Sequence, residues 1–173
     1  MDRPAGRPSV FGTSGIRGPF GTDVDADLAR RLGRALAACS YDRVVLGRDG
    51  RETGPLLADA LSAGARECGT DVVRLGRVAT PALARSVAWQ DADAGVVVTA
   101  SHNPPADNGF KLWTPRGMAF DGDRREAIET ALATDAGEPA AWDALGTETT
   151  AAGATERHRA AVCGAVPAGI DLS

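Results

Sequence analysis

Apolar residues recur along several stretches of the chain with the period of an amphipathic helix. Between residues 25 and 39 they are spaced by four, four and three positions, which places them on one face of a helix. These residues are Leu28, Leu32, Leu36 and Cys39. Further helices are predicted over 54–68, from Pro81 onward with Thr80 as the N-cap, over 123–132 and, as a short segment, over 158–163.

Short apolar runs of strand length alternate with these helices. They cover 43–47, 71–76, 95–99 and 110–113, and the third contains three consecutive valines. Apolar runs without polar alternation are typical of strands that are covered on both faces. Strands that alternate with helices predict an α/β fold, which we expect to be a three-layer α/β/α sandwich around a mostly parallel, mixed sheet.

Three loops are expected at one edge of this sheet. The stretch 12–18 contains three glycines and suits a tight loop, while 47–51 and 100–110 follow predicted strands. Ligands of such sheets bind beyond the carboxyl ends of the strands. The polar residues of the three loops are Ser14, Arg17, Arg48, Asp49, Arg51, Ser101, His102, Asn103, Asn108 and Lys111. Basic and amide side chains dominate this set, which favours a phosphate group as ligand.

Composition narrows the class of protein. The chain has 173 residues, of which 43% are apolar, and this is enough for one core. The net charge of −4 argues against nucleic acid as the main partner, because the phosphate backbone favours a surplus of Lys and Arg. No apolar run approaches the roughly 20 residues that a membrane-spanning helix needs, so no membrane partner is expected.

Cysteine usage and the start of the chain bear on location. The three cysteines, Cys39, Cys68 and Cys163, are an odd number without paired metal spacing, and no signal-like apolar segment opens the chain. We therefore expect a reduced, soluble, cytoplasmic protein.

The chain divides into three parts by pattern. Residues 1–9 form a polar tail, and residues 10–135 carry the alternating strands and helices of one domain. Residues 133–155 are mostly Ala, Thr, Gly, Asp and Glu with weak periodicity, which indicates a linker or loose loop. We expect 136–173 to comprise this linker and the truncated start of a following domain.

Ser101 lies on a loop at the end of the strongest predicted strand. The stretch Ala100–Pro105 contains an Asn and two prolines, which exclude a continued strand or an immediate helix. A serine hydrolase is disfavoured, because the sequence here lacks Gly-x-Ser-x-Gly and the adjacent His102 is poorly placed as a general base. Arg, Lys and loop amides instead suit a serine that carries a phosphoryl group.

Lys111 is the single lysine among 19 basic residues. A general preference for Arg explains why lysine is scarce, but it does not explain where the remaining lysine lies. A lysine in a crowded phosphate site can lower its pKa and exchange a proton, whereas a guanidinium stays protonated.

Four motifs resemble the first domain of the α-D-phosphohexomutases, the phosphoglucomutase and phosphomannomutase group. They are Phe11-Gly12-Thr13-Ser14-Gly15-Ile16-Arg17-Gly18, Gly47-Arg48-Asp49-Gly50-Arg51, Thr99-Ala100-Ser101-His102-Asn103-Pro104 and Asn108-Gly109-Phe110-Lys111. Their order and spacing match that group over residues 10 to about 132. The resemblance implies transfer between hexose 1-phosphate and hexose 6-phosphate through a bisphosphorylated sugar, with hexose 1,6-bisphosphate as activator.

The resemblance also implies roles for individual residues. Ser101 matches the phosphoserine, and its phosphate would be one ligand of Mg²⁺. Arg17 and Lys111 match basic residues beside the transferring phosphate, with Lys111 as general acid/base, and His102 matches the histidine beside the phosphoserine. Phosphate binding is expected from Ser14, Arg48, Arg51, Asn103 and Asn108, although Asp49 and Arg51 could instead have a structural role.

The chain departs from the family's metal-binding pattern. The family holds Mg²⁺ with three aspartates of an Asp-Gly-Asp-x-Asp-Arg loop in its second domain. Residues 121–126 begin in the same way, but Arg125 and Glu126 stand where the last Asp and the Arg would be. We interpret Asp123 as an N-cap or first-turn residue of a helix.

Further partners and alternatives follow from this departure. A C-terminal fragment or a second copy of the chain could supply what one domain lacks, and the chain alone is expected to be inactive. The alternative function is a non-catalytic phosphosugar or phosphate-binding module. Glucose, mannose and glucosamine phosphates are not distinguished by these residues.

Overall fold

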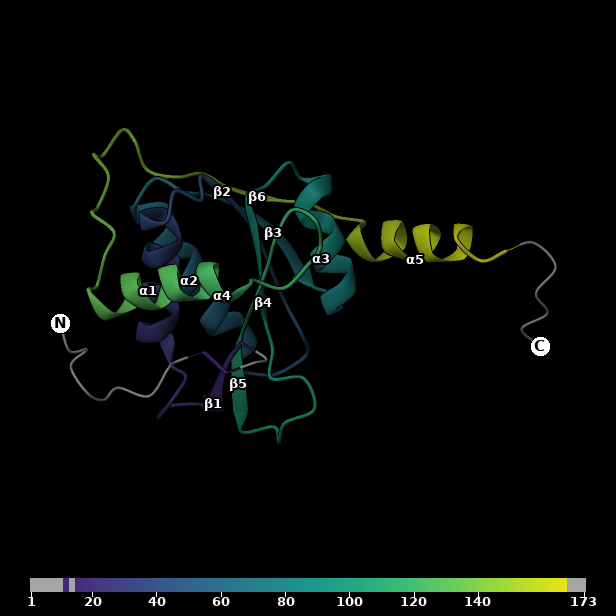
Figure 1. Ribbon diagram of the computed structural model, residues 1–173, viewed down its shortest axis with the longest axis horizontal. Coiled ribbons are helices and arrows are strands. Elements are labelled where there is room, and N and C mark those ends of the chain that lie inside the picture. The colour runs from purple at the N-terminus through teal and green to yellow at the C-terminus, as the bar shows by residue number, and fades with distance from the viewer. Residues whose placement is uncertain (1–10, 13–14, 168–173) are drawn as a thin grey trace.

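A mixed six-stranded sheet forms the middle layer of the fold in this computed structural model, which describes residues 11, 12 and 15–167 (Figure 1). The strands are β1 (Ile16–Pro19), β2 (Arg43–Arg48), β3 (Asp71–Arg77), β4 (Ala94–Val98), β5 (Asp107–Trp113) and β6 (Glu148–Thr150), in the order β1-β5-β4-β2-β3-β6. Strands β4, β2, β3 and β6 are mutually parallel, whereas β5 runs antiparallel to both β4 and β1. The predicted mostly parallel sheet is therefore confirmed.

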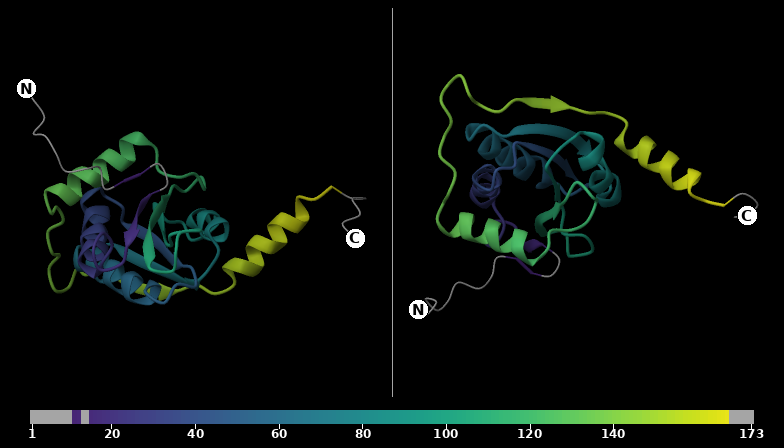
Figure 2. Two further views of the ribbon diagram at one scale, coloured as in Figure 1. Left: turned by 90° about the horizontal axis from the view of Figure 1, so that it is seen from below. Right: turned by 45° about the horizontal axis from the view of Figure 1, so that its top comes forward.

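Helices cover both faces of this sheet, which gives the predicted three layers (Figures 1 and 2). One face carries α1 (Ala26–Ala38), α2 (Gly54–Glu67) and α4 (Gly122–Ala133), and the other carries α3 (Thr80–Trp89). The last helix, α5 (Ala154–Gly164), contacts α3 and extends away from the sheet (Figure 2). The cation of Arg157 on α5 lies 4.4 Å from the ring centre of Trp89 on α3.

Consecutive strand residues serve opposite cores, which explains why the strands lack polar alternation. Leu46 and Val96 are buried against α1 and α2, while Val45 and Val97 are buried against α3. Because side chains alternate between the faces of a strand, a sheet covered on both sides needs apolar residues at every position. The valine-rich runs that predicted buried strands meet this requirement.

Two glycines allow α1 and α2 to pack with their backbones in contact. A Cβ on Gly64 would lie 2.0 Å from the carbonyl oxygen of Arg30, and one on Gly33 would lie 2.2 Å from that of Leu61. Any larger residue at either position would push the helices apart. This crossing fixes the α1–α2 layer beneath β2 and β4.

Strand β1 replaces part of a predicted loop. The sequence indicated a loop over 12–18, but Ile16–Pro19 pairs with β5, with Ile16 opposite Phe110. The local pattern could not predict this strand, because half of its four residues are Gly and Pro and its partner lies far along the chain. The predicted apolar step into the loop begins at Val10, which lies outside the described residues.

Strand β6 lies within the stretch that was interpreted as a linker, and that interpretation is wrong for these residues. The three exposed residues Glu148–Thr150 carry no apolar pattern, but their backbone pairs in parallel with β3. The preceding segment is also fixed, because Arg34 Nη2 donates to the carbonyl of Gly137 at 2.6 Å and Ala140 N donates to that of Glu67 at 2.7 Å. These contacts join residues that are far apart in the sequence, so the local pattern could not predict them.

Helix boundaries follow the sequence closely except at the starts of α3 and α5. The last helix, predicted over 158–163, begins four residues earlier, at Ala154. Asp25 caps α1 by accepting from the backbone N–H of Leu28 at 2.8 Å. The predicted cap of α3, Thr80, is instead its first residue, and the N-cap position is held by Ala79 without a side-chain hydrogen bond.

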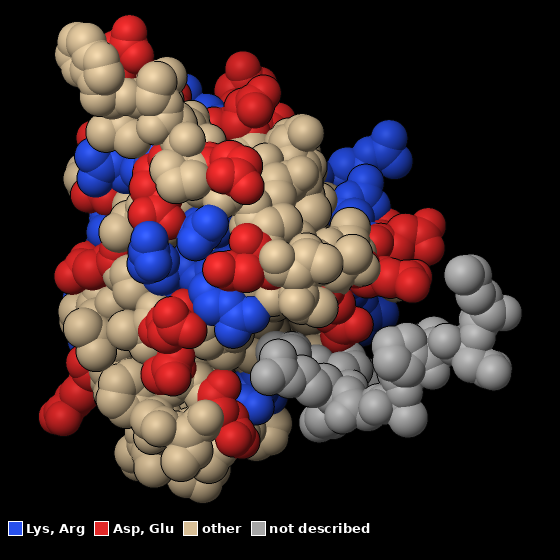
Figure 3. Space-filling model, turned by 90° about the vertical axis from the view of Figure 1, so that its left-hand side faces the viewer, with Lys and Arg blue, Asp and Glu red and all other residues tan. Residues whose placement is uncertain are grey.

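Basic and acidic side chains alternate on the face seen in Figure 3, where a central group of basic side chains is bordered by acidic ones. Ion pairs join residues of opposite charge: Arg34 Nε lies 3.5 Å from Glu67 Oε1, and Arg34 Nη1 lies 3.7 Å from Asp135 Oδ2. In the part of the chain that the structure describes, no helix combines the length and apolar character needed to cross a bilayer.

Candidate functional site

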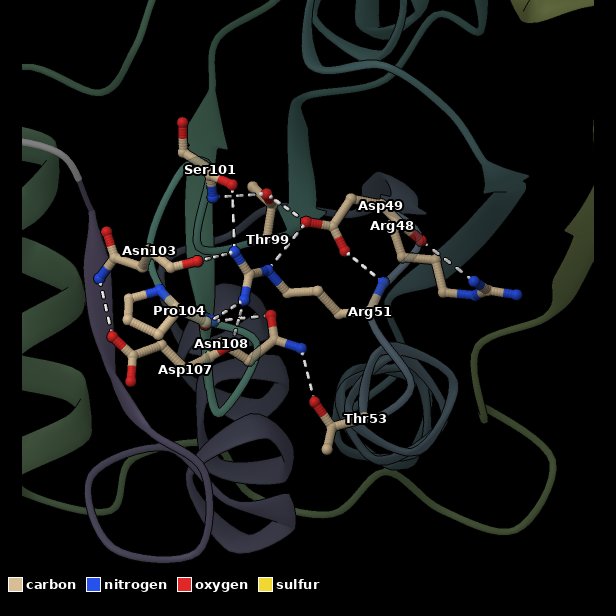
Figure 4. Close-up of polar contacts among 11 residues, drawn as sticks. Arg48, Asp49, Arg51, Thr53, Thr99, Ser101, Asn103, Pro104, Asp107 and Asn108 are labelled. Atoms are coloured by element: carbon tan, nitrogen blue, oxygen red, sulfur yellow. Dashed lines mark hydrogen bonds and ion pairs between the residues drawn. The ribbon is translucent and has the colours of Figure 1, made fainter.

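Ser101 lies just beyond the carboxyl end of β4 in a left-handed backbone conformation. Its φ is 59°, and its side chain is exposed. A left-handed residue with a Cβ costs about 1–2 kcal/mol relative to a right-handed one, so other contacts must hold it there. Its hydroxyl points away from the neighbouring polar contacts in Figure 4, toward the open side of the loop.

The backbone N–H of Ser101 is held through two side chains. It donates to Thr99 Oγ1 at 2.9 Å, and the Thr99 hydroxyl donates to Asp49 Oδ2 at 2.6 Å. Thr99 is buried directly after β4, and Asp49 directly follows β2. The parallel pairing of β2 and β4 brings these two strand ends together.

Arg51 holds the carbonyl side of the same loop. Its guanidinium donates to Asp49 Oδ2 at 3.3 Å and to four backbone carbonyls, those of Ser101 (3.1 Å), Asn103 (2.7 Å), Pro104 (2.6 Å) and Asp107 (2.8 Å). A guanidinium has five N–H donors, and all five are used here (Figure 4). In this arrangement no guanidinium donor remains for a phosphate oxygen, which favours the structural role of Arg51 over phosphate binding.

The two asparagines of the loop also make internal contacts. Asn108 is 0% exposed, and its amide donates to Thr53 Oγ1 at 2.8 Å just before α2. The side chain is thus engaged within the protein, and the expected phosphate contact of Asn108 stays a prediction. Asn103 donates to Asp107 Oδ2 at 2.9 Å and is partly exposed.

Arg17 and Lys111 approach the loop from the antiparallel strands. Arg17 on β1 pairs with Gly109 on β5. The carbonyl of Gly109 accepts from the backbone N–H of Thr99 at 2.9 Å, so the Arg17–Gly109 pair lies beside the end of β4. Lys111 is two residues from Gly109, which places it on the same face of β5. A Cβ on Gly109 would lie 2.0 Å from the carbonyl oxygen of Ile16 and 3.0 Å from Arg17 Cα, so glycine permits this close approach.

The electrostatics of this pair fit a phosphate site. Burial, and then the charge of Arg17, lower the pKa of Lys111 below its usual 10.5. Arg17 Nε is buried and has no hydrogen-bond partner among the described residues. A cavity of about 220 Å³ adjoins Lys111 and is also lined by Trp113, Phe120 and Arg125. Positive charge and an unused donor thus meet on one side of the loop.

Of the remaining predicted site residues, His102 and Arg48 have exposed or partly exposed side chains. His102 is exposed beside Ser101, and because Ser101 is left-handed the argument from an extended backbone does not apply to this pair. Arg48 donates to the carbonyl of Asp49 at 3.1 Å and is partly exposed. Ser14 lies outside the described residues.

The acidic residues near α4 serve the helix. Asp121 is the N-cap, accepting from Arg124 N at 3.0 Å, and Asp123 lies in the first turn. The described residues contain no group of three or more His, Cys, Asp or Glu side chains that could hold a metal ion. Ser101, through a phosphate, remains the expected metal ligand of this chain.

Thr99 and Thr53 are the residues that sequence reasoning missed. Thr99 continues the valine run of β4, where a β-branched residue is ordinary, so its hydroxyl gave no signal. Thr53 occupies the N-cap position of α2 without a side-chain cap bond, because its hydroxyl accepts from Asn108. The only sequence signal for either residue is its position beside one of the predicted polar loops.

Comparisons with known proteins agree with this geometry. The family model "Phosphoglucomutase/phosphomannomutase, alpha/beta/alpha domain I" matches residues 8–138. A "Probable phosphoglucosamine mutase" of Methanococcoides burtonii is 44% identical over 149 residues, covering 86% of this chain and 34% of the relative. The "Phosphoglucosamine mutase" of Methanococcus maripaludis is 41% identical over 137 residues, covering 79% and 29%.

A solved structure has the same arrangement of elements. A phosphoglucomutase/phosphomannomutase family protein of Burkholderia thailandensis superposes with a TM-score of 0.76 at 36% identity, covering 94% of this chain and 37% of that one. The chain thus spans about a third of the length of the relatives it matches. Since the family model covers most of it, the chain belongs to the phosphoglucomutase/phosphomannomutase family and carries the family's α/β/α domain I.

Proposed function

We propose that Ser101 carries and transfers the phosphoryl group in a phosphohexomutase that interconverts hexose 1-phosphate and hexose 6-phosphate through a bisphosphorylated sugar. The observation that supports this most is the presentation of Ser101. It is exposed and left-handed at a strand end, with its backbone N–H and C=O both held and its hydroxyl free to react. Family membership supports the reaction type.

The proposed transfer requires one bond to form and one to break. Ser101 Oγ attacks a phosphorus of the hexose 1,6-bisphosphate, and the bond from that phosphorus to the sugar oxygen breaks. The serine hydroxyl gives up its proton to the general acid/base, which returns a proton to the sugar oxygen. Lys111 is the proposed general acid/base, since its lowered pKa favours proton exchange. Arg17 stabilises the phosphoryl oxygens with its positive charge.

Mg²⁺ is part of the proposal only through Ser101. When bound, such an ion neutralises charge on the transferring phosphoryl group. The described carboxylates of the region are engaged elsewhere, Asp49 with Thr99 and Arg51 and Asp121 with the N-terminus of α4. These residues do not form a magnesium cage, so no step is assigned to the ion.

Complete turnover is proposed for this chain together with the other two thirds of a family member. Phosphoryl transfer depends on positioning and charge neutralisation at both phosphates of the sugar. The site described here supports the first phosphate only. The names of the relatives support glucosamine phosphates as the first sugars to test, ahead of glucose and mannose phosphates.

The test is covalent labelling of the purified chain. We expect ³²P from a labelled hexosamine 1,6-bisphosphate, given with Mg²⁺ and a separately produced C-terminal part of a relative, to appear on Ser101 in a peptide map. Ser101→Ala should remove the label. Ser40→Ala is the matched control, because Ser40 is also exposed and left-handed but lies at the end of α1. Reversible binding without any label would favour the phosphate-binding module instead.

A further inference from the structure

Ser101, the proposed phosphoserine, and three residues around it form a closed ring of hydrogen bonds. Asp49 Oδ2 accepts from the Thr99 hydroxyl at 2.6 Å and from Arg51 Nε at 3.3 Å. Thr99 Oγ1 accepts from Ser101 N at 2.9 Å, and Arg51 Nη2 donates to Ser101 O at 3.1 Å. Both peptide groups beside the Ser101 Cα are therefore tied back to one carboxylate (Figure 4).

The direction of every bond in this ring is fixed by chemistry. An ionised carboxylate only accepts, so the single hydroxyl hydrogen of Thr99 points to Asp49. A lone pair of Thr99 Oγ1 is then left for the N–H of Ser101. Arg51 only donates, and its backbone N–H adds a bond of 2.9 Å to Asp49 Oδ1. No member can reverse its role, which distinguishes this ring from an adaptable polar cluster.

The ring opposes the strain at Ser101. A serine free of restraint prefers a negative φ, and rotation to such a value would swing its hydroxyl away from the present direction. Thr99 is 4% exposed, and the side chain of Arg51 is 12% exposed. The bonds that join Asp49, Thr99, Arg51 and the Ser101 N–H are partly buried, whereas the bond from Arg51 to Ser101 O is exposed. Water competes less for the partly buried bonds, so these can hold a strained residue.

We infer that Asp49 is a positioning residue, which acts through Thr99 and Arg51 to keep Ser101 in the left-handed conformation that aims its hydroxyl at the phosphoryl donor. Asp49 does not contact the phosphate in this assignment, because Thr99 and Arg51 occupy its oxygens. The inference rests on the proposed function for its catalytic consequence. The conformational consequence, that Ser101 stays in its left-handed conformation, does not depend on any reaction.

Thr99 gives the sharpest test, because one atom carries both of its bonds. Thr99→Val keeps shape and burial but removes the hydroxyl, and we expect the rate of Ser101 labelling to fall about 10- to 10²-fold, as for a misplaced reacting group. Thr99→Ser restores the hydroxyl and should recover most of that rate. Thr70→Val is the matched control, because Thr70 is also buried and bonds a backbone carbonyl, that of Tyr41, at 2.8 Å in another loop.

A second measurement keeps the inference testable if no label is transferred at all. Hydrogen exchange of the Ser101 amide, followed by NMR on the complete chain, should be faster in Thr99→Val and Asp49→Asn than in wild type and in Thr70→Val. Absence of label in wild type would overturn the proposed function while leaving this comparison intact. Unchanged exchange in folded Thr99→Val and Asp49→Asn, or undiminished labelling in Thr99→Val, would overturn the positioning role.

Discussion

Lys111 on β5 and Arg17 on β1 share one face of the sheet, and the charge of Arg17 adds to burial in lowering the pKa of Lys111. Two cations in proximity repel each other unless an anion lies between or beside them. The arrangement is therefore unfavourable for the free protein and favourable for a protein that has bound a phosphate. It also gives one of the two cations, the lysine, the ability to lose its proton.

Lys111→Arg is expected to lower the rate of Ser101 labelling by about 10²-fold or more, as for the loss of a general acid/base. The guanidinium keeps the positive charge but stays protonated, and its planar fork is wider than an ammonium. The measurement is the initial rate of label transfer at saturating bisphosphate. Arg116→Lys, an exchange between the same residue types at an exposed turn, is the control. A rate near that of wild type would mean that Lys111 contributes charge only.

The pH dependence of labelling should report the interaction between Arg17 and Lys111. Neutral Lys111 can accept the proton of Ser101, so the rate is expected to rise with pH through the lowered pKa of Lys111, below the usual 10.5. Arg17→Gln removes the neighbouring charge and should move this rise to higher pH, whatever it does to the maximum rate. An unshifted midpoint in Arg17→Gln would show that the charge of Arg17 does not lower the pKa of Lys111.

Ser101→Gly is expected to stabilise the fold even though it removes the reacting hydroxyl. Relief of the left-handed strain is worth about 1–2 kcal/mol, and the greater freedom of glycine in the unfolded chain takes back about 0.5–1 kcal/mol. Urea unfolding should therefore show a net gain of about 0.5–1 kcal/mol in the free energy of unfolding. Ser101→Ala keeps a Cβ and should show no gain. Equal stability of the two variants would contradict strain at this residue.

The sequence could predict the layers of the fold because the buried strands carry their own signal. The valine run of β4 and the helical spacing of Leu32 and Leu36 are local patterns that burial on both faces of a sheet demands. β1 and β6 have no such pattern, because their pairing energy comes from distant strands. Predictions from periodicity fail where an element is stabilised only by its partner.

The candidate site was predicted in location more fully than in detail. Motif order placed Ser101, Arg17 and Lys111 together, but residue type alone could not separate Arg51 from Arg17. Both are arginines near the 101–107 loop. Arg51 has all five donors bonded to protein oxygens, whereas the buried Nε of Arg17 has no partner among the residues that the structure describes. That difference depends on how the 101–107 loop folds around Arg51.

The attachment of β6 should weaken in acid. Hydrogen bonds from the side chain and backbone of Thr147 lower the pKa of Asp71 below 3.8. Burial raises the pKa of Glu148, but hydrogen bonds from Ser62 and Arg74 outweigh it and bring the pKa below 4.5. A carboxylate with a lowered folded-state pKa stabilises the fold above its unfolded pKa, and this contribution is lost as pH falls through the folded value.

Hydrogen exchange of residues 147–150 measures that loss, after correction for the intrinsic effect of pH. We expect protection of this segment to fall below about pH 4 while residues 44–48 of β2 and 94–98 of β4 stay protected, since these residues pair through their backbones. Glu148→Gln should weaken protection already at neutral pH, because the neutral amide loses the ion pair with Arg74 at 2.9 Å, and it should flatten the acid response. Asp121→Asn is the control, because the pKa of Asp121 is also lowered, by the backbone N–H of Arg124, but at the start of α4. Asp121→Asn should change the protection of α4 alone.

If the acid-induced loss of protection in β6 is identical in wild type and Glu148→Gln, Glu148 does not anchor the strand.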